Sequence, residues 1–267
     1  MAKTQPSIWA NRFKGKRALV TGGGRGIGAA IARRLGAEGA LVAICYRTRS
    51  HEADEIAGEI VSNGGQAFTI QADLEHKSAI DALWDAWDET SEGLVGNNRL
   101  DILINNAGVT SAAPLTEIFE HAVDRILAIN TKGPLFMSAE GAKRMSQGGR
   151  IVTIGSGAAK QPGKLNGAYG MSKAALLAMT RSLAVELGQH GITANVVSPG
   201  YTLTDITAHM LSVPEFSEKV KRLTAMDRIG RPEDVAAMVC FLASDEAEWV
   251  TGQWIEATGG YKLVPPV

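Results

Sequence analysis

The stretch that decides the fold reads Leu19-Val20-Thr21-Gly22-Gly23-Gly24-Arg25-Gly26-Ile27-Gly28. Its glycines follow a short apolar run and precede residues with helical periodicity, so they predict a turn from the first strand into the first helix. Glycine permits positive φ and a close approach of the backbone to a ligand, and the N-terminus of a helix attracts anions. The turn therefore predicts a pyrophosphate site, and a purely structural turn is the alternative.

Short apolar runs and longer amphipathic stretches alternate along the whole chain. The predicted strands are 17–21, 40–46, 66–71, 100–105, 150–155 and 192–197, and the predicted helices are 28–38, 52–63, 78–89, 116–145 and 168–187. Such alternation is typical of a parallel sheet covered by helices on both faces. We therefore predict an α/β fold, a single Rossmann-type domain with a doubly wound parallel sheet of about seven strands.

The domain is expected to span 14–262, because no linker, repeat or low-complexity tract interrupts it. Residues 1–13 form an N-terminal extension and 263–267 a C-terminal tail. The segment 202–228 suits short helices packed over a site, so we predict a substrate lid there, and an ordinary connecting helix pair is the alternative. The segment 91–98 is predicted to be a surface loop.

Composition narrows the function classes. The 267 residues carry 27 basic and 28 acidic side chains and a formal charge of −1, so nucleic acid is not an expected partner. No segment is apolar over about eighteen residues, and residues 1–14 lack the apolar run of a secretory signal, so no membrane partner is expected. Cys45 and Cys240 form neither a disulfide framework nor a CxxC pair, which predicts a reduced compartment, by default the cytoplasm. The scattered histidines predict no metal site.

Tyr169 and Lys173 lie four residues apart at the start of a strongly helical run, a spacing that puts both side chains on one helix face. Ser156 follows the predicted strand 150–155, at the sheet edge where ligands bind in open α/β sheets. A tyrosine hydroxyl normally titrates near about 10, so acid/base work at neutral pH requires a nearby positive charge, which Lys173 supplies. Ser156 is expected to donate a hydrogen bond to the substrate oxygen. Alone, the Tyr169/Lys173 spacing would describe an ordinary surface pair.

Taken together, Thr21-Gly22-x3-Gly26-x-Gly28, Ser156 and Tyr169-x3-Lys173 resemble the short-chain dehydrogenase/reductase family, and its 3-oxoacyl-ACP reductase-like members in particular. The resemblance runs from about Lys14 to Tyr261. It implies reversible hydride transfer between a cofactor and the carbonyl of a small-molecule substrate. It also implies a homo-oligomer, a tetramer or dimer, formed through the helices at 116–145 and 168–187.

The resemblance completes a catalytic tetrad with Asn130, which would hold a water that links Lys173 to solvent. An asparagine bonded to the local backbone is the alternative. Tyr169 would deliver the proton, helped by the positive nicotinamide of the oxidised cofactor. The resemblance places the adenine ribose beside Asn105-Asn106-Ala107-Gly108, the adenine beside Asp73-Leu74 and the nicotinamide carboxamide beside Pro199-Gly200 and Thr204. The full set of expected cofactor-binding residues is Gly22, Arg25, Gly26, Ile27, Gly28, Arg47, Thr48, Asp73, Leu74, Asn105, Ala107, Gly108, Tyr169, Lys173, Pro199, Gly200 and Thr204.

Near the end of the chain, 228–234 and 250–253 resemble the family's closing helix and last strand. Arg231 and Asp234 are expected to be structural, as a surface base and a helix N-terminal acid.

The end of the second predicted strand, Ile44-Cys45-Tyr46-Arg47-Thr48-Arg49, bears on the choice of cofactor. It lacks the acidic residue with which an NAD enzyme holds the ribose hydroxyls. Arg47 stands there instead, and with Arg25 it would converge on a 2′-phosphate. We therefore predict NADP(H), with NAD(H) and solvated arginines as the alternatives.

The sequence thus predicts an NADP(H)-dependent ketoreductase. Two alternatives stay open: a non-redox enzyme on the same scaffold, and a regulatory protein that senses NADP(H). Lys160, Lys164 and Asn166 would border the substrate and favour a polar or acidic one, unless they are simply solvated.

Overall fold

The computed structural model describes residues 11–110 and 112–263. Residues 1–10 of the expected extension and 264–267 of the expected tail lie outside this range. Within it, seven strands form one parallel sheet in the order β3-β2-β1-β4-β5-β6-β7. The strands are β1 (Arg17–Thr21), β2 (Leu41–Tyr46), β3 (Gln66–Gln71), β4 (Ile102–Asn105), β5 (Arg150–Ile154), β6 (Thr193–Pro199) and β7 (Trp254–Ala257). The predicted doubly wound α/β fold is confirmed.

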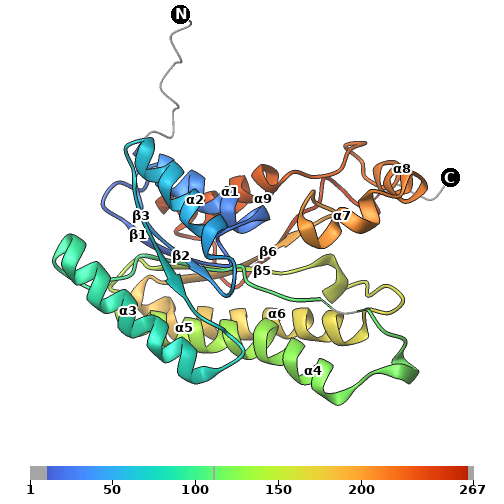
Figure 1. Ribbon diagram of the computed structural model, residues 1–267, viewed down its shortest axis with the longest axis horizontal. Coiled ribbons are helices and arrows are strands. Elements are labelled where there is room, and N and C mark those ends of the chain that lie inside the picture. Colours follow the sequence, from blue (N-terminus) through green and yellow to red (C-terminus); the bar gives the residue numbers. More distant parts are fainter. Residues whose placement is uncertain (1–10, 111, 264–267) are drawn as a thin grey trace, which may run out of the picture.

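Helices cover both faces of this sheet (Figure 1). One layer holds α1 (Gly26–Ala37), α2 (Ser50–Ser62) and α9 (Pro232–Leu242), and the other holds α3 (Lys77–Val95), α4 (Glu120–Leu127), α5 (Gly133–Arg144) and α6 (Gly167–Leu187). Two further helices, α7 (Asp205–Leu211) and α8 (Pro214–Arg222), follow β6. Short helical turns occupy Leu115–Glu117, Ala128–Lys132, Gly157–Ala159, Gly188–His190 and Asp245–Ala247.

Two hydrophobic cores result from the alternation of side chains along each strand. In β1, Ala18 and Val20 join the core beneath α1, α2 and α9, while Leu19 joins the core beneath α3, α5 and α6. Both faces are buried, which is why the strands read as nearly continuous apolar runs.

Three predicted elements are corrected by the structure. The single helix at 116–145 is wrong, because a π-helical turn at Ala128–Lys132 separates α4 from α5. The last strand at 250–253 is also wrong, because the pairing of β7 with β6 begins only at Trp254. Before it, the Thr251 hydroxyl accepts from the Ala194 N–H, and the Val250 carbonyl accepts from the Asn195 side chain. The predicted loop 91–98 is shorter, since α3 continues to Val95 and ends at Gly96, where φ is +72°.

The order of the strands reverses between β1 and β4, which lie side by side although β2 and β3 intervene in sequence. In open α/β sheets, ligands bind at the carboxyl ends of the strands at such a switch point. Here those ends lead into Gly22 after β1 and into Asn106 after β4. No helix of the described residues is long and apolar enough to cross a membrane.

Candidate active site

The glycine turn between β1 and α1 is folded too tightly for side chains. Gly22 and Gly26 have φ of +63° and +52°, angles that residues with a Cβ rarely adopt. A Cβ on Gly28 would lie 2.2 Å from the Gly22 carbonyl oxygen and 2.5 Å from Asn106 Nδ2. The side chain of Ile27, between Gly26 and Gly28, packs against the core. The turn thus forms a bare backbone cradle at the N-terminus of α1, which fits the pyrophosphate of a dinucleotide.

Two polar residues brace this cradle. The hydroxyl of Thr21 accepts hydrogen bonds from the Asn106 and Ala107 backbone N–H groups at 2.9 and 3.0 Å. In return, Asn106 Nδ2 donates to the carbonyls of Thr21 and Gly22 at 2.9 and 3.0 Å. The neighbouring Asn105 points elsewhere and donates to Ser138 on α5 at 2.9 Å. Sequence reasoning selected Asn105 and Ala107 as site residues and quoted Asn106 in the same motif without selecting it.

Ser156 and Tyr169 face one another across the sheet edge. Ser156 follows β5 and its hydroxyl accepts a hydrogen bond from the Ala158 N–H at 3.2 Å. Tyr169 lies in the first turn of α6. Burial raises the pKa of Tyr169, and its side-chain hydrogen bond with Ser156 acts in the opposite direction on that pKa. Among the chain's own groups burial dominates, so the phenol keeps its proton at neutral pH.

Lys173 lies one helical turn beyond Tyr169 and is buried. Its ammonium donates a hydrogen bond to the Ile154 carbonyl, at the end of β5, at 2.9 Å. Burial lowers the pKa of Lys173 to about 8. The structure therefore places an amine that changes charge slightly above neutral pH on the same helix face as the tyrosine.

Asn130 lies in the π-helical turn and is fully buried. Its side chain accepts from the Val109 N–H and donates to the Val109 carbonyl, both at 2.8 Å. It also donates to Ser172 Oγ at 3.1 Å, and Ser172 Oγ in turn donates to the Tyr169 carbonyl at 2.7 Å. Asn130 is thereby connected to the helix that carries Tyr169, through Ser172, a residue that sequence reasoning missed.

Asn130 and Lys173 both lie close to Gly108, in the segment after β4. A Cβ on Gly108 would lie 3.3 Å from Asn130 Oδ1 and 3.5 Å from Lys173 Nζ. The four residues predicted as a tetrad therefore gather around the end of β5 and the segment that follows β4, although they come from three separate parts of the fold: the π-helical turn, the segment after β5 and α6.

Of the predicted nicotinamide contacts, Thr204 lies beside the glycine turn, and Pro199 and Gly200 lie beside the end of β7. Pro199 ends β6, and the Gly200 N–H donates to the Ala257 carbonyl at 3.1 Å. Thr204 precedes α7, and its Cγ2 lies 3.3 Å from the position that a Cβ on Gly26 would occupy. The segment after β6 thus closes over the glycine turn.

The predicted adenine contacts lie on the other side. Leu74 is buried, and the Asp73 carboxylate accepts from the Glu75 N–H at 3.1 Å. Thr48 is exposed and lies two residues after the end of β2. Arg47 Nη1 lies 3.7 Å from Asp73 Oδ2, so these two predicted residues form an ion pair.

The other arginines near the glycine turn share an acidic partner. Arg25 Nη1 lies 2.5 Å from Asp205 Oδ2 at the start of α7. Arg49 Nη1 lies 3.7 Å from the same Asp205 oxygen. The structure therefore adds Arg49 to the candidate phosphate-binding residues, a residue that sequence reasoning quoted but did not select.

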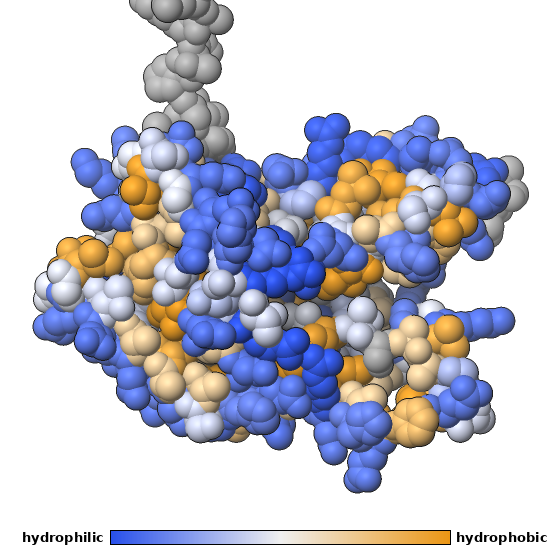
Figure 2. Space-filling view, viewed as in Figure 1, coloured by the Kyte–Doolittle hydropathy of each residue, from blue (hydrophilic) through white to orange (hydrophobic). Residues whose placement is uncertain are grey.

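Apolar side chains flank a hollow beside α7 and α8. Figure 2 shows a hollow between the lobe of α7 and α8 and the lobe below it, with hydrophobic residues on both sides. Exposed apolar residues of the lower side come from 115–119 and 165, and those of the upper side from 203–213. On the lower side they border α6, since the Leu115 side chain lies 2.8 Å from where a Cβ on Gly167 would be. The exposed apolar residues of these segments are Leu115, Ile118, Phe119, Leu165, Leu203, Ile206, Met210 and Val213.

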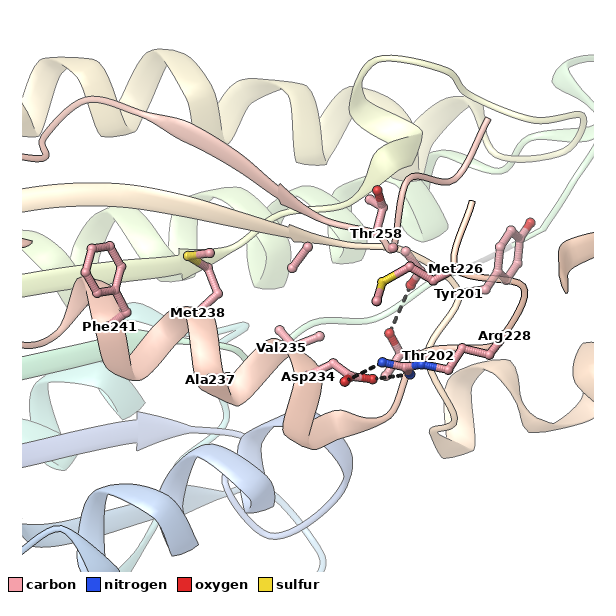
Figure 3. Close-up of a pocket in the computed structure, with 14 residues that line it drawn as sticks. Tyr201, Thr202, Met226, Arg228, Asp234, Val235, Ala237, Met238, Phe241 and Thr258 are labelled. Carbon is pink, nitrogen blue, oxygen red and sulfur yellow. Dashed lines mark hydrogen bonds and ion pairs between the residues drawn. The ribbon is translucent and has the colours of Figure 1, made fainter. Parts of the chain in front are cut away.

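A cavity of about 400 Å³ lies elsewhere, between α9 and the segments that follow β6 and β7 (Figure 3). Met238 and Phe241 of α9 line it, and the Arg228–Asp234 ion pair stands at one end. Of the predicted site residues it contains only Gly200. Asp234 acts structurally as predicted, because it accepts from the Arg231 N–H at 2.7 Å in the first turn of α9, and the Arg228 hydrogen bond lowers its pKa to about 2.

A dinucleotide cradle at the switch point, beside a Tyr-x3-Lys pair with a buried lysine and a serine, defines a nucleotide-dependent oxidoreductase site. The family model described as "Enoyl-(Acyl carrier protein) reductase" matches residues 22–262. Together with the relatives below, this match shows that the chain belongs to the short-chain dehydrogenase/reductase family.

Among its relatives, a probable tetrahydroxynaphthalene reductase of Zymoseptoria tritici is 38% identical over 95% of this chain and 97% of its own. A versicolorin reductase of Emericella nidulans is 36% identical over 93% and 96%. The crystal structure of the angucycline C-6 ketoreductase LanV, with bound NADP, superimposes with a TM-score of 0.91 at 38% identity, over 96% of this chain and 98% of LanV.

Proposed function

We propose that this protein is an NADPH-dependent ketoreductase that reduces a carbonyl on an apolar, ring-shaped substrate, with Tyr169 as the proton donor. The observation that carries the proposal is the half-buried Tyr169, hydrogen-bonded to Ser156 and placed one turn from the buried Lys173, beside the glycine cradle. Reduced NADP would supply the hydride.

The chain's own residues account for the proton. Burial raises the pKa of Tyr169, so the phenol holds its proton until negative charge develops on the substrate oxygen. Ser156, hydrogen-bonded to the tyrosine, is placed to donate to the same oxygen. The Lys173 ammonium would stabilise the phenolate left behind, since opposite charges nearby favour the ionised form.

Binding of NADP(H) is supported by the glycine cradle and by the arginines after β2. Arg25, Arg47 and Arg49 stand near the ribose position, and β2 ends without an acidic residue there. LanV and a short-chain dehydrogenase of Burkholderia cenocepacia, 38% identical to this chain, both have NADP in their crystal structures.

The substrate class is supported by the apolar hollow and by the relatives. Leu115 and Phe119 on one side and Ile206 on the other favour a flat apolar body over an acidic one. Lys160, which would have favoured an acidic substrate, is ion-paired with Glu256 at 2.6 Å. One relative is named for tetrahydroxynaphthalene, a fused aromatic compound.

The test is loss of NADPH absorbance with a panel of carbonyl compounds: 1-tetralone, a naphthoquinone, an aliphatic ketone, a 3-oxoacyl thioester and an enoyl thioester. We expect turnover of the bicyclic compounds, and Tyr169→Phe should lower kcat by at least about 100-fold while still binding NADPH. Ser182→Ala, on the exposed side of α6, is the matched control and should keep full activity.

The alternatives give different results. Near-normal turnover by Tyr169→Phe at pH 7 would contradict the role of the tyrosine. Tight NADPH binding without turnover of any panel compound would favour the sensing protein instead.

A further inference from the structure

Asp205 connects the segment over the active site to the arginines at the adenosine end. It is the first residue of α7, and its carboxylate faces Arg25 at 2.5 Å and Arg49 at 3.7 Å. Arg25 belongs to the glycine turn, and Arg49 directly precedes α2. One carboxylate therefore ties three segments that are far apart in the sequence.

Neighbouring residues hold the Arg25–Asp205 ion pair in place. Thr204, one residue before Asp205, lies close to Gly26, the residue after Arg25, since its Cγ2 is 3.3 Å from the position that a Cβ on Gly26 would occupy. The start of α7 and the glycine turn thus approach each other at two consecutive residue pairs. The side chains of Arg25 and Asp205 are 47% and 58% exposed, so solvent screens the ion pair and a stronger anion can displace the carboxylate.

We propose that Asp205 is a specificity-determining residue that occupies, with its carboxylate, the arginine site used by the 2′-phosphate of NADP(H). The inference rests on the proposed function, because it assumes that this cofactor binds. A phosphate monoester carries about −1.5 to −2 charges near pH 7, against −1 for the carboxylate, so it competes effectively for Arg25 and Arg49. When the phosphate takes the arginines, the N-terminus of α7 is released from the glycine turn.

Two consequences follow from this exchange. The carboxylate weakens the binding of any ligand with a 2′-phosphate, because the ion pair must first be broken, and it leaves NAD(H) binding unaffected. The exchange also couples cofactor binding to the freedom of α7, since the helix loses the charge contact that holds its first turn.

The first experiment compares Asp205→Asn with the wild type by titration calorimetry, using adenosine 2′,5′-bisphosphate, AMP, NADPH and NADH. We expect Asp205→Asn to lower the Kd for the bisphosphate and for NADPH by about two- to fivefold, the range of an exposed ion pair, and to leave the Kd for AMP and NADH unchanged. Glu215→Gln removes the same charge from the first turn of α8 and should change none of these values.

The second experiment follows amide hydrogen exchange in 206–211. In the wild type, adenosine 2′,5′-bisphosphate should speed exchange in α7 while AMP does not. In Asp205→Asn, exchange should be fast without any ligand.

The outcomes separate the two proposals. Weaker NADPH binding by Asp205→Asn would overturn the inference, because the carboxylate would then be orienting the arginine rather than competing for it. Equal changes for NADPH and NADH would overturn it as well. If the wild type binds neither NADPH nor the bisphosphate, the proposed cofactor itself is wrong.

Discussion

Gly28 shows how a single residue carries the geometry of the cofactor turn. Its own φ is not positive, so many side chains would fit its backbone angles. What excludes them is the space around it, because the Gly22 carbonyl and the Asn106 amide occupy the position of a Cβ. The requirement comes from contact across the turn.

We expect Gly28→Ala to push Gly22 and Asn106 apart. The added methyl group should cost about 1–3 kcal/mol of stability, the range for an overpacked site, and weaken NADPH binding at least about tenfold. Thermal unfolding and titration calorimetry measure the two effects. Gly58→Ala, at an exposed position of α2 with open space around it, should leave NADPH binding unchanged. A Gly28→Ala protein with wild-type affinity would contradict this account of the turn.

At this scale the sequence predicted residues whose type is dictated by local chemistry. The glycines of the turn and the Tyr169/Lys173 spacing are readable because a backbone turn and a helix face are local. Asn106 was not selected because its task depends on the contact of β4 with β1, 85 residues away, which only the fold creates. The sequence feature that could have identified Asn106 is a second polar residue directly after the buried strand β4.

At the scale of elements, the break between α4 and α5 is the least predictable feature. Apolar periodicity continues through 116–145, yet the helix is interrupted where Asn130 bonds to Val109 rather than facing solvent. A π-helical turn often marks a functional site. Here it directs a buried amide toward the segment after β4, beside Gly108 and Lys173.

We expect Asn130→Ala to loosen that segment specifically. It leaves both backbone groups of Val109 without their partner, which should cost about 2–4 kcal/mol of stability, and hydrogen exchange of the Val109 amide should accelerate. Exchange measured by NMR or mass spectrometry, with Asn63→Ala at the exposed end of α2 as the control, tests this. Unchanged exchange at Val109 would show that the π-helical turn is held by other contacts.

For the whole molecule, the alternation of strands and helices was enough to predict the layers, because burial on both faces leaves a direct pattern in the strands. The order of the strands was not predicted, because right-handed crossovers restrict the possible orders without fixing one. The apolar hollow could not be predicted from the sequence, since its residues come from segments separated by about ninety positions in the sequence. The homo-oligomer and the cytoplasmic location stay predictions.

Lys173 couples the active site to the stability of the whole molecule. Its pKa falls from 10.5 to about 8 in the folded chain because burial disfavours the charged form. Below pH 8 both folded and unfolded chains carry the charge, so the folded state bears the full cost of burial. Between about pH 8 and 10.5 the unfolded chain binds more protons than the folded chain, so the contribution of this residue to stability rises with pH.

We therefore expect Lys173→Met to be inactive but more stable than the wild type at pH 7, by about 2 kcal/mol once the lost hydrogen bond to Ile154 is subtracted. The advantage should shrink as pH rises from 8 and be lost by about 10.5, because the wild-type lysine is then neutral in both states. Urea unfolding of both proteins across this pH range measures the difference, in which other titrating groups cancel. Lys164→Met, at an exposed position, should show no such trend. A stability difference that does not change with pH would mean that the folded chain pays no charge-burial cost at Lys173, and that the amine is solvated.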